Sequence, residues 1–216
     1  MTPRPGATGR AHHAMACALL AGLALAGSPA HALGPAEGIW NFSVTLDDRP
    51  IGEHRFRLAT QESGERSVES TARFTVRVMG IALYRYRHEA RELWRGDCLV
   101  KITSDTDDDG QPGAVQQEFM PGGAGTACTR SFAYWNPAIL DSRELLDPQT
   151  GKLEPVRISR QQEDTLTVRG QAVAAVRWRI EGPKHPIDVW YATGSGEWVG
   201  LDSTVRGGRQ LRYRLP

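Results

Sequence analysis

His54, His88 and Glu92 are the side chains of this sequence best suited to proton transfer, because they stand among apolar residues in alternating runs. A histidine there could act as a base, or the three polar groups could line a pocket with a few polar atoms. A strand rises about 3.3 Å per residue, so His88 and Glu92 are too far apart for a direct bond along one strand. Hydrogen-bonded core residues are the structural alternative. We identify no catalytic constellation.

An acidic stretch matches the opening of a calcium-binding loop. It runs Asp105-x-Asp107-x-Asp109-Gly110, but its twelfth position is Gln116 where such a loop needs a bidentate glutamate. The stretch also follows a strand-like run, whereas a calcium loop follows a helix. We therefore predict an acidic hairpin turn, no metal site and no cofactor.

Aromatic residues are more informative than the titratable ones. Tyr84, Tyr86 and Trp94 share one face of a strand-like run, and Phe132, Tyr134 and Trp135 cluster just before a helix-like segment. Tyrosine and tryptophan combine apolar area with a polar atom, which suits a ligand pocket, although an ordinary aromatic core is the alternative. The predicted ligand-binding residues are His54, Tyr84, Tyr86, His88, Trp94, Phe132, Tyr134, Trp135 and Asn136.

The remaining chemistry concerns cysteine. Cys17 lies in an apolar run near the N-terminus, which leaves Cys98 and Cys128 in the rest of the chain. In an oxidising compartment such a pair is first interpreted as a disulfide. Two buried free thiols are an open alternative. A Cys/His metal site is disfavoured because no histidine is close to either cysteine in the sequence.

Period-2 alternation predicts the elements that position these residues. Between 40 and 94 four runs each place apolar residues on one face and charged residues on the other, with turns at 48–50, 63–65 and around Gly80. This pattern is typical of an antiparallel meander with one face on a core. The four runs are 40–46, 54–58, 68–78 and 84–94.

Further strands and one helix complete the prediction. Asn136 followed by Pro137 is typical of a helix start, and we expect a short helix or helical turn over 138–146. The fold class is all-β and mainly antiparallel: a curved meander sheet, half-barrel or barrel with one short helical insert. The further strands are expected at 98–106, 115–120, 127–132, 156–159, 165–168, 173–180, 187–191, 198–205 and 210–215.

The N-terminus has the layout of a bacterial secretory signal peptide. Arg4 and Arg10 precede a 13-residue apolar run, 14–26, and the small-x-small triplet Ala30-His31-Ala32 follows it. The run is too short to span a bilayer, and no later run approaches that length. We expect cleavage after Ala32, a periplasmic location, and a single β-rich domain over 33–216.

The charge of that domain argues against nucleic acid as a partner. Without Arg4 and Arg10, 24 basic residues face 25 acidic ones, a net charge of −1. A nucleic-acid-binding domain would show a basic footprint. No protein partner is indicated by any motif.

Several stretches resemble a family of exported bacterial proteins classed as a domain of unknown function. They are Ser131-Phe-Ala-Tyr-Trp-Asn136, Leu145-Leu-Asp-Pro-Gln-Thr-Gly151, Asp47-Asp-Arg-Pro-Ile-Gly52 and Tyr84-Arg-Tyr-Arg-His88. The resemblance covers the whole chain after residue 32 and implies an exported β-rich fold but no activity. The architecture is also similar, more loosely, to periplasmic lipoprotein carriers, in which a curved sheet holds acyl chains under a helical lid.

Three functions stay open at this point. The first is a non-catalytic periplasmic binding protein or carrier for a hydrophobic small molecule or lipid, which predicts a continuous apolar cavity. The second is an envelope assembly or interaction module, which predicts a filled interior and an exposed apolar patch. The third is a hydrolase-like enzyme using His88 or His54, which predicts two titratable groups meeting at a cleft.

Overall fold

The computed structural model of the chain describes residues 1, 35, 37–120, 128–182 and 185–216. The chain divides into two units, Met1–Ala32 and Leu33–Pro216, and all elements described below belong to the second. The expected signal peptide and its cleavage site lie outside the described residues, apart from Met1.

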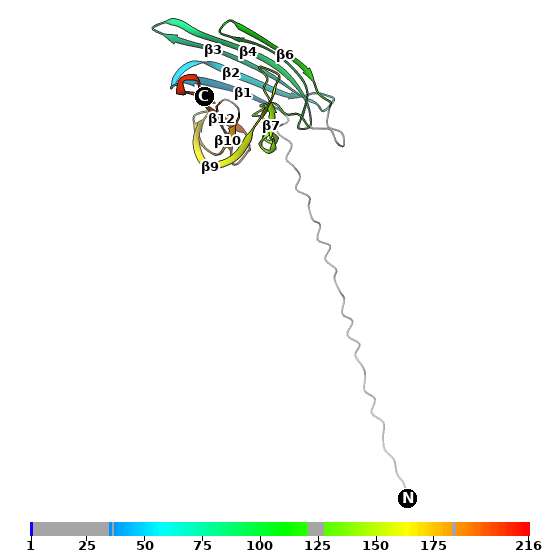
Figure 1. The fold of residues 1–216 in the computed structure, drawn as a ribbon. Coiled ribbons are helices and arrows are strands. Elements are labelled where there is room, and N and C mark those ends of the chain that lie inside the picture. The colour runs from blue at the N-terminus through cyan, green and yellow to red at the C-terminus, as the bar shows by residue number, and fades with distance from the viewer. Residues whose placement is uncertain (2–34, 36, 121–127, 183–184) are drawn as a thin grey trace. The chain divides into compact units, whose positions relative to one another are not determined.

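Eleven antiparallel strands form one curved sheet in the order β6-β5-β4-β3-β2-β1-β13-β12-β11-β10-β9 (Figure 1). β1 pairs with β13, so the first and last strands join two meanders into one sheet. Within the described residues β6 and β9 are free edges, which confirms the all-β curved sheet and shows that it does not close into a barrel. The strands are β1 (Gly38–Leu46), β2 (Arg49–Thr60), β3 (Arg66–Val78), β4 (Ile81–Arg95), β5 (Cys98–Asp108), β6 (Gln111–Glu118), β9 (Arg157–Val168), β10 (Gln171–Glu181), β11 (Ile187–Ala192), β12 (Trp198–Val205) and β13 (Arg209–Arg214).

Tight two-residue turns connect several of the strands. Asp109 and Gly110 both have positive φ, 53° and 84°, as a type I′ hairpin turn requires. Asp47 and Asp48 also have positive φ, 48° and 63°. The first turn therefore lies at 47–48, ahead of the predicted 48–50, because the aspartates tolerate the left-handed conformation and Pro50 continues into β2.

One glycine allows two strands to approach closely at a bend. Gly52 has φ +151°, and a Cβ there would lie 1.9 Å from the Arg73 carbonyl oxygen of β3. The pairing of β1 with β2 shifts register nearby, between Val44 and Thr45. Only glycine fits such a backbone, so this position contributes to the curvature of the sheet.

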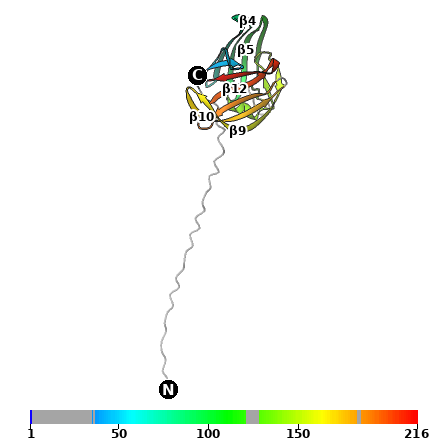
Figure 2. The ribbon, with the colours of Figure 1, turned by 90° about the vertical axis from the view of Figure 1, so that its left-hand side faces the viewer.

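The link between β6 and β9 has to cross the sheet, because these two strands are its opposite edges. We name residues 128–156 of this link the crossing segment. It contains the 3-10 helix η1 (Pro137–Asp141), β7 (Glu144–Leu146) and β8 (Leu153–Pro155), and β7 pairs with β8. Figure 2 shows β4 and β5 above β9, β10 and β12, which curve round at the other side of the sheet.

The structure corrects three sequence-based predictions in this region. The helix is shorter than 138–146, because Leu145 and Leu146 lie fully buried on β7. The runs 156–159 and 165–168 belong to one strand, β9. Of the run 127–132, residue 127 lies outside the described residues, and from 128 on only Ser131 forms an isolated bridge, to Leu146.

The core lies on the inner face of the sheet and against the crossing segment. Its largest fully buried side chains are Trp94, Trp135, Trp198 and Phe42, which come from both halves of the sheet and from the crossing segment. Phe42 and Trp198 pack with ring centroids 4.4 Å apart and join β1 to β12. In the described part of the chain, no helix is long and apolar enough to cross a membrane.

Candidate ligand-binding pocket

A pocket of about 940 Å³ lies on the inner face of the sheet. Its walls come from β2, β3 and β4 on one side, from β12 and β13 on the other, and from the crossing segment. Ligand pockets in proteins have volumes of about 300–1,000 Å³, so this pocket has room for a small organic ligand.

The strand directions define two ends of the pocket. The turns at 79–80, 109–110 and 206–208 lie at one end of the sheet, and Leu83, Asp109 and Arg206 line the pocket there. We call this end the mouth. Glu92 and Trp135 line the opposite end, which we call the inner end.

Stacked rings form much of the wall between the two ends. The Phe74 and Tyr86 rings stack with centroids 5.3 Å apart, and Tyr86 continues to His88 at 6.3 Å. The His54 ring stacks on Phe56 at 4.0 Å. Offset aromatic pairs of this kind add about 0.5–1.5 kcal/mol each beyond their buried area, so this wall is largely preformed.

His54 lies on β2 in the middle of the pocket wall. Its Nε2 is 2.7 Å from the Ser70 Oγ, and its Nδ1 is 3.4 Å from the Tyr213 hydroxyl. Burial lowers the pKa of His54 from 6.5 to about 3, with a smaller contribution from His88. The imidazole is therefore neutral at physiological pH and offers one donor and one acceptor.

His88 lies two strands away on the same row of the sheet, since Ala72 of β3 pairs with both histidines. Its Nδ1 is 2.8 Å from the Thr106 Oγ1. Burial lowers the pKa of His88, and the charges of Asp147 and Glu89 oppose this effect. Each histidine thus has a hydroxyl partner on a neighbouring strand.

Glu92 places a carboxyl group at the inner end. The Ser131 hydroxyl donates to its Oε1 at 2.8 Å, and the Trp94 indole donates to its Oε2 at 2.9 Å. Burial raises the pKa of Glu92, and the two hydrogen bonds counteract the rise. Glu92 takes part in no ion pair with a described residue.

The crossing segment contributes Phe132, Tyr134 and Trp135 to the pocket. The Tyr134 ring packs on Trp198 at 5.4 Å, and the Tyr134 carbonyl accepts a hydrogen bond of 2.8 Å from the Tyr191 hydroxyl. Further along, the Ser104 hydroxyl donates to the Pro148 carbonyl at 2.5 Å. The segment is therefore tied to both halves of the sheet.

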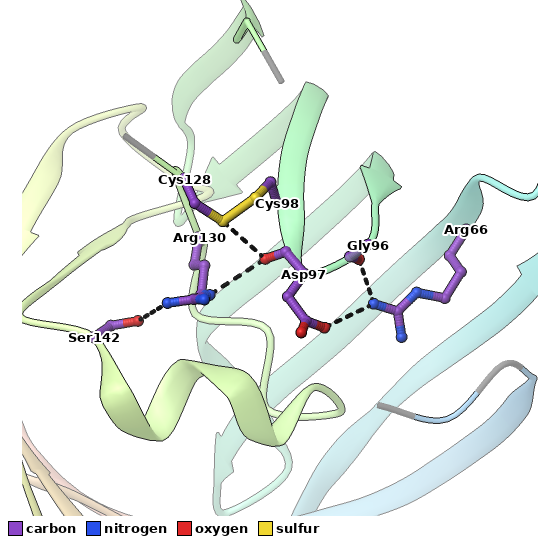
Figure 3. Close-up of a disulfide and its surroundings, with 7 residues drawn as sticks. All are labelled: Arg66, Gly96, Asp97, Cys98, Cys128, Arg130 and Ser142. Carbon is purple, nitrogen blue, oxygen red and sulfur yellow. Dashed lines mark hydrogen bonds and ion pairs between the residues drawn. A yellow bond between two sulfur atoms is a disulfide. The ribbon is translucent and has the colours of Figure 1, made fainter. Parts of the chain in front are cut away.

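A disulfide fastens the start of this segment to the β4–β5 turn (Figure 3). Cys98 and Cys128 are bonded, with a sequence separation of 30 residues, as the even cysteine pair suggested. Beside it the Arg130 Nε donates to the Asp97 carbonyl at 3.3 Å, and its Nη1 donates to the Ser142 hydroxyl at 3.4 Å.

Arg66 connects the region around this disulfide to Trp135 in the wall of the pocket. The Arg66 guanidinium donates to the Gly96 carbonyl and forms an ion pair of 3.1 Å with Asp97. Its carbon Cζ lies 4.8 Å from the centre of the Trp135 ring. The disulfide and the neighbouring Arg66 contacts therefore support the wall of the pocket at its inner end.

The structure brings most of the predicted ligand-binding residues together in this pocket. Trp94 and Asn136 are exceptions: the Trp94 side chain is fully buried against Trp135, and the Asn136 side chain accepts from the Ala138 N–H as the cap of η1. The residues that line the pocket are His54, Tyr84, Tyr86, His88, Phe132, Tyr134 and Trp135.

Other lining residues were not selected from the sequence. Phe56 and Phe74 lie an even number of residues from His54 and Tyr86 and therefore point to the same inner face of the sheet. The alternation could have identified them. Trp198 and Tyr213 reach the pocket because β13 pairs with β1, a long-range contact that alternation does not reveal.

Exposed apolar side chains surround part of the mouth. At the tip of the β3–β4 hairpin Met79, Ile81 and Leu83 are 97%, 66% and 59% exposed. This hairpin reaches beyond its neighbours in Figure 1, and Leu83 also lines the pocket. An apolar surface therefore runs from the hairpin tip into the pocket.

The fold and the pocket define a class of protein, an all-β protein with an open curved sheet around a pocket lined by aromatic, aliphatic and polar side chains. The chain belongs to the family described as "Domain of unknown function (DUF6134)", whose model matches residues 42–216. This membership confirms the resemblance to a domain of unknown function. No curated protein matches the chain.

The solved structures that match the chain include the following two. The beta-barrel-like protein of domain of unknown function DUF1849 from Brucella abortus has a TM-score of 0.56 at 9% identity, over 86% of this chain and 98% of that chain. LprF from Mycobacterium bovis covers 83% of this chain and 85% of its own at 16% identity, with a TM-score of only 0.27. The first similarity shows a shared β fold, and the second supports no conclusion about fold or ligand.

Proposed function

We propose that this protein is a non-catalytic periplasmic binding protein or carrier for a hydrophobic small molecule or lipid. The pocket is the observation that supports this proposal best: about 940 Å³ on the inner face of the sheet, walled by rings such as Phe74, Tyr86 and Trp135. A filled interior, as expected for a pure interaction module, would leave no such space. The few polar groups among the rings would orient the ligand.

The location outside the cytoplasm rests on two further features. The N-terminal sequence has the pattern of a signal peptide, and the fold contains a Cys98–Cys128 disulfide. Disulfides persist in oxidising compartments such as the periplasm. The ligand would therefore be a molecule of the bacterial envelope.

Filling the pocket tests the binding function. Ala90 is buried on β4 and lines the pocket, whereas the preceding residue, Glu89, points to the opposite, exposed face. We expect wild-type protein to take up an apolar naphthylamine dye with enhanced fluorescence, and Ala90→Trp to lose most of that signal. Glu89→Trp is the matched control and should bind as wild type does. Equal dye binding by wild type and Ala90→Trp would contradict the proposal.

A hydrolase is the second candidate, favoured by the 2.7 Å separation of the His54 Nε2 and the Ser70 Oγ. A histidine that activates a serine needs a pKa near the working pH and usually an acidic orienting partner. His54 has a pKa of about 3 and a tyrosine, Tyr213, at its other nitrogen. This arrangement serves hydrogen bonding to a ligand better than proton abstraction.

A further inference from the structure

Glu92 is an unusual residue for the inner end of an apolar pocket. It is one of the residues that line the pocket, and no arginine, lysine or histidine of the described residues forms an ion pair with it. The nearest arginine on the neighbouring strand, Arg66, is paired with Asp97 instead. A buried carboxylate without a cationic partner is costly, so a partner from outside the chain would stabilise it.

The hydrogen bonds of Glu92 fix its orientation but do not exhaust its capacity. Each oxygen accepts one hydrogen bond, from Ser131 and from Trp94, and a carboxylate has about four acceptor sites. The two protein donors hold the carboxyl plane in place. Among the described residues no other donor occupies the remaining acceptor sites, which leaves them for a donor group of a ligand.

Aromatic side chains around this end favour a cation as that donor. Phe132, Tyr134 and Trp135 all line the pocket. The face of an aromatic ring attracts an ammonium group. Phe132 and Tyr134 keep partial exposure for such a contact, whereas the Trp135 ring is buried and already faces Arg66. By contrast, the Trp135 indole nitrogen is shielded from the pocket, so it offers no hydrogen bond to an anionic head group.

We propose that the inner end of the pocket binds the protonated amine of an amphiphile, with Glu92 as its counter-ion and the alkyl chain directed toward the mouth. This inference rests on the proposed binding function and specifies its ligand class. The chain would run past the Phe74 and Tyr86 rings to Val78 and Leu83 at the mouth. The mouth is the side where apolar side chains are already exposed.

A series of ligands with one alkyl chain tests the proposal. Binding of dodecylamine, dodecanol and dodecanoate is measured at pH 7, below their micelle concentrations, by the change in tryptophan fluorescence. For wild type we expect dodecylamine to bind at least about ten-fold more tightly than dodecanoate, since a hydrogen bond between an ammonium and a carboxylate is stronger than one between neutral groups, whereas two carboxylates repel each other. Glu92→Gln should reduce this preference to about three-fold or less, while Glu89→Gln on the outer face should retain it.

The outcomes separate the two proposals. Equal binding of the three ligands, a preference for dodecanoate, or an unchanged preference in Glu92→Gln would overturn the head-group proposal and leave the binding function standing. No binding of any ligand would overturn the binding function and this inference with it. If Glu92→Gln does not fold, the wild-type series alone decides, because a missing amine preference overturns the proposal.

Discussion

At the scale of residues, burial acts on His54 and Glu92 in the same way, by disfavouring the charged form. It lowers the pKa of the imidazole and raises the pKa of the carboxyl group. Both groups lie in the pocket wall, so the unliganded pocket favours neutral side chains. Their effects on stability have opposite dependence on pH.

His54 makes the folded protein less stable in acid. The pKa of His54 is about 3 when folded and 6.5 when unfolded, so between these values the unfolded chain binds the additional proton. The free energy of unfolding is therefore highest above pH 6.5 and falls toward pH 3. We expect wild type to lose about 1–3 kcal/mol more than His54→Gln between pH 7 and pH 4, measured by urea unfolding at each pH.

NMR titration of the His54 ring measures the pKa of His54 directly and tests whether His54 can act as the base of a hydrolase. The ring should show no titration between pH 5 and pH 8. A pKa near 7 would contradict a neutral, ligand-orienting imidazole and would favour His54 as a base for Ser70, 2.7 Å away.

At the scale of elements, the sheet could be predicted from sequence far better than the crossing segment. Alternation located most strands because one face of the sheet is buried and the other is charged. Leu145 and Leu146 suggested a helix because their spacing fits both kinds of element. Only the pairing of β7 with β8 shows that these residues form a strand and not a helix. The local hydrophobic pattern does not predict that pairing.

The disulfide is the covalent anchor of the crossing segment. Closing a loop of 30 residues stabilises the fold by about 3–4 kcal/mol in the chain-entropy model. We expect the double variant Cys98→Ala/Cys128→Ala to lose about this much in urea unfolding. Reduced wild type should match the variant. Identical unfolding midpoints for oxidised wild type and the variant would contradict a stabilising role.

At the scale of the whole molecule, the pocket arises from an open sheet and a connection that must cross it. β6 and β9 stay apart as edges, and the segment between them covers part of the inner face. The alternation of the sequence predicted that His54, Tyr86 and His88 point to the inner face of the sheet. The pairing of β1 with β13, which brings Tyr213 and Trp198 into the same wall, did not, because it joins residues more than 150 positions apart.

The central claim is that this pocket holds a hydrophobic ligand in the cell. Native mass spectrometry of the protein, purified gently from the cells that produce it naturally and then extracted with organic solvent, tests it most directly. We expect a reproducible additional mass that is absent from Ala90→Trp and present in Glu89→Trp. Protein that is consistently free of any bound mass, across several growth conditions, would contradict the claim.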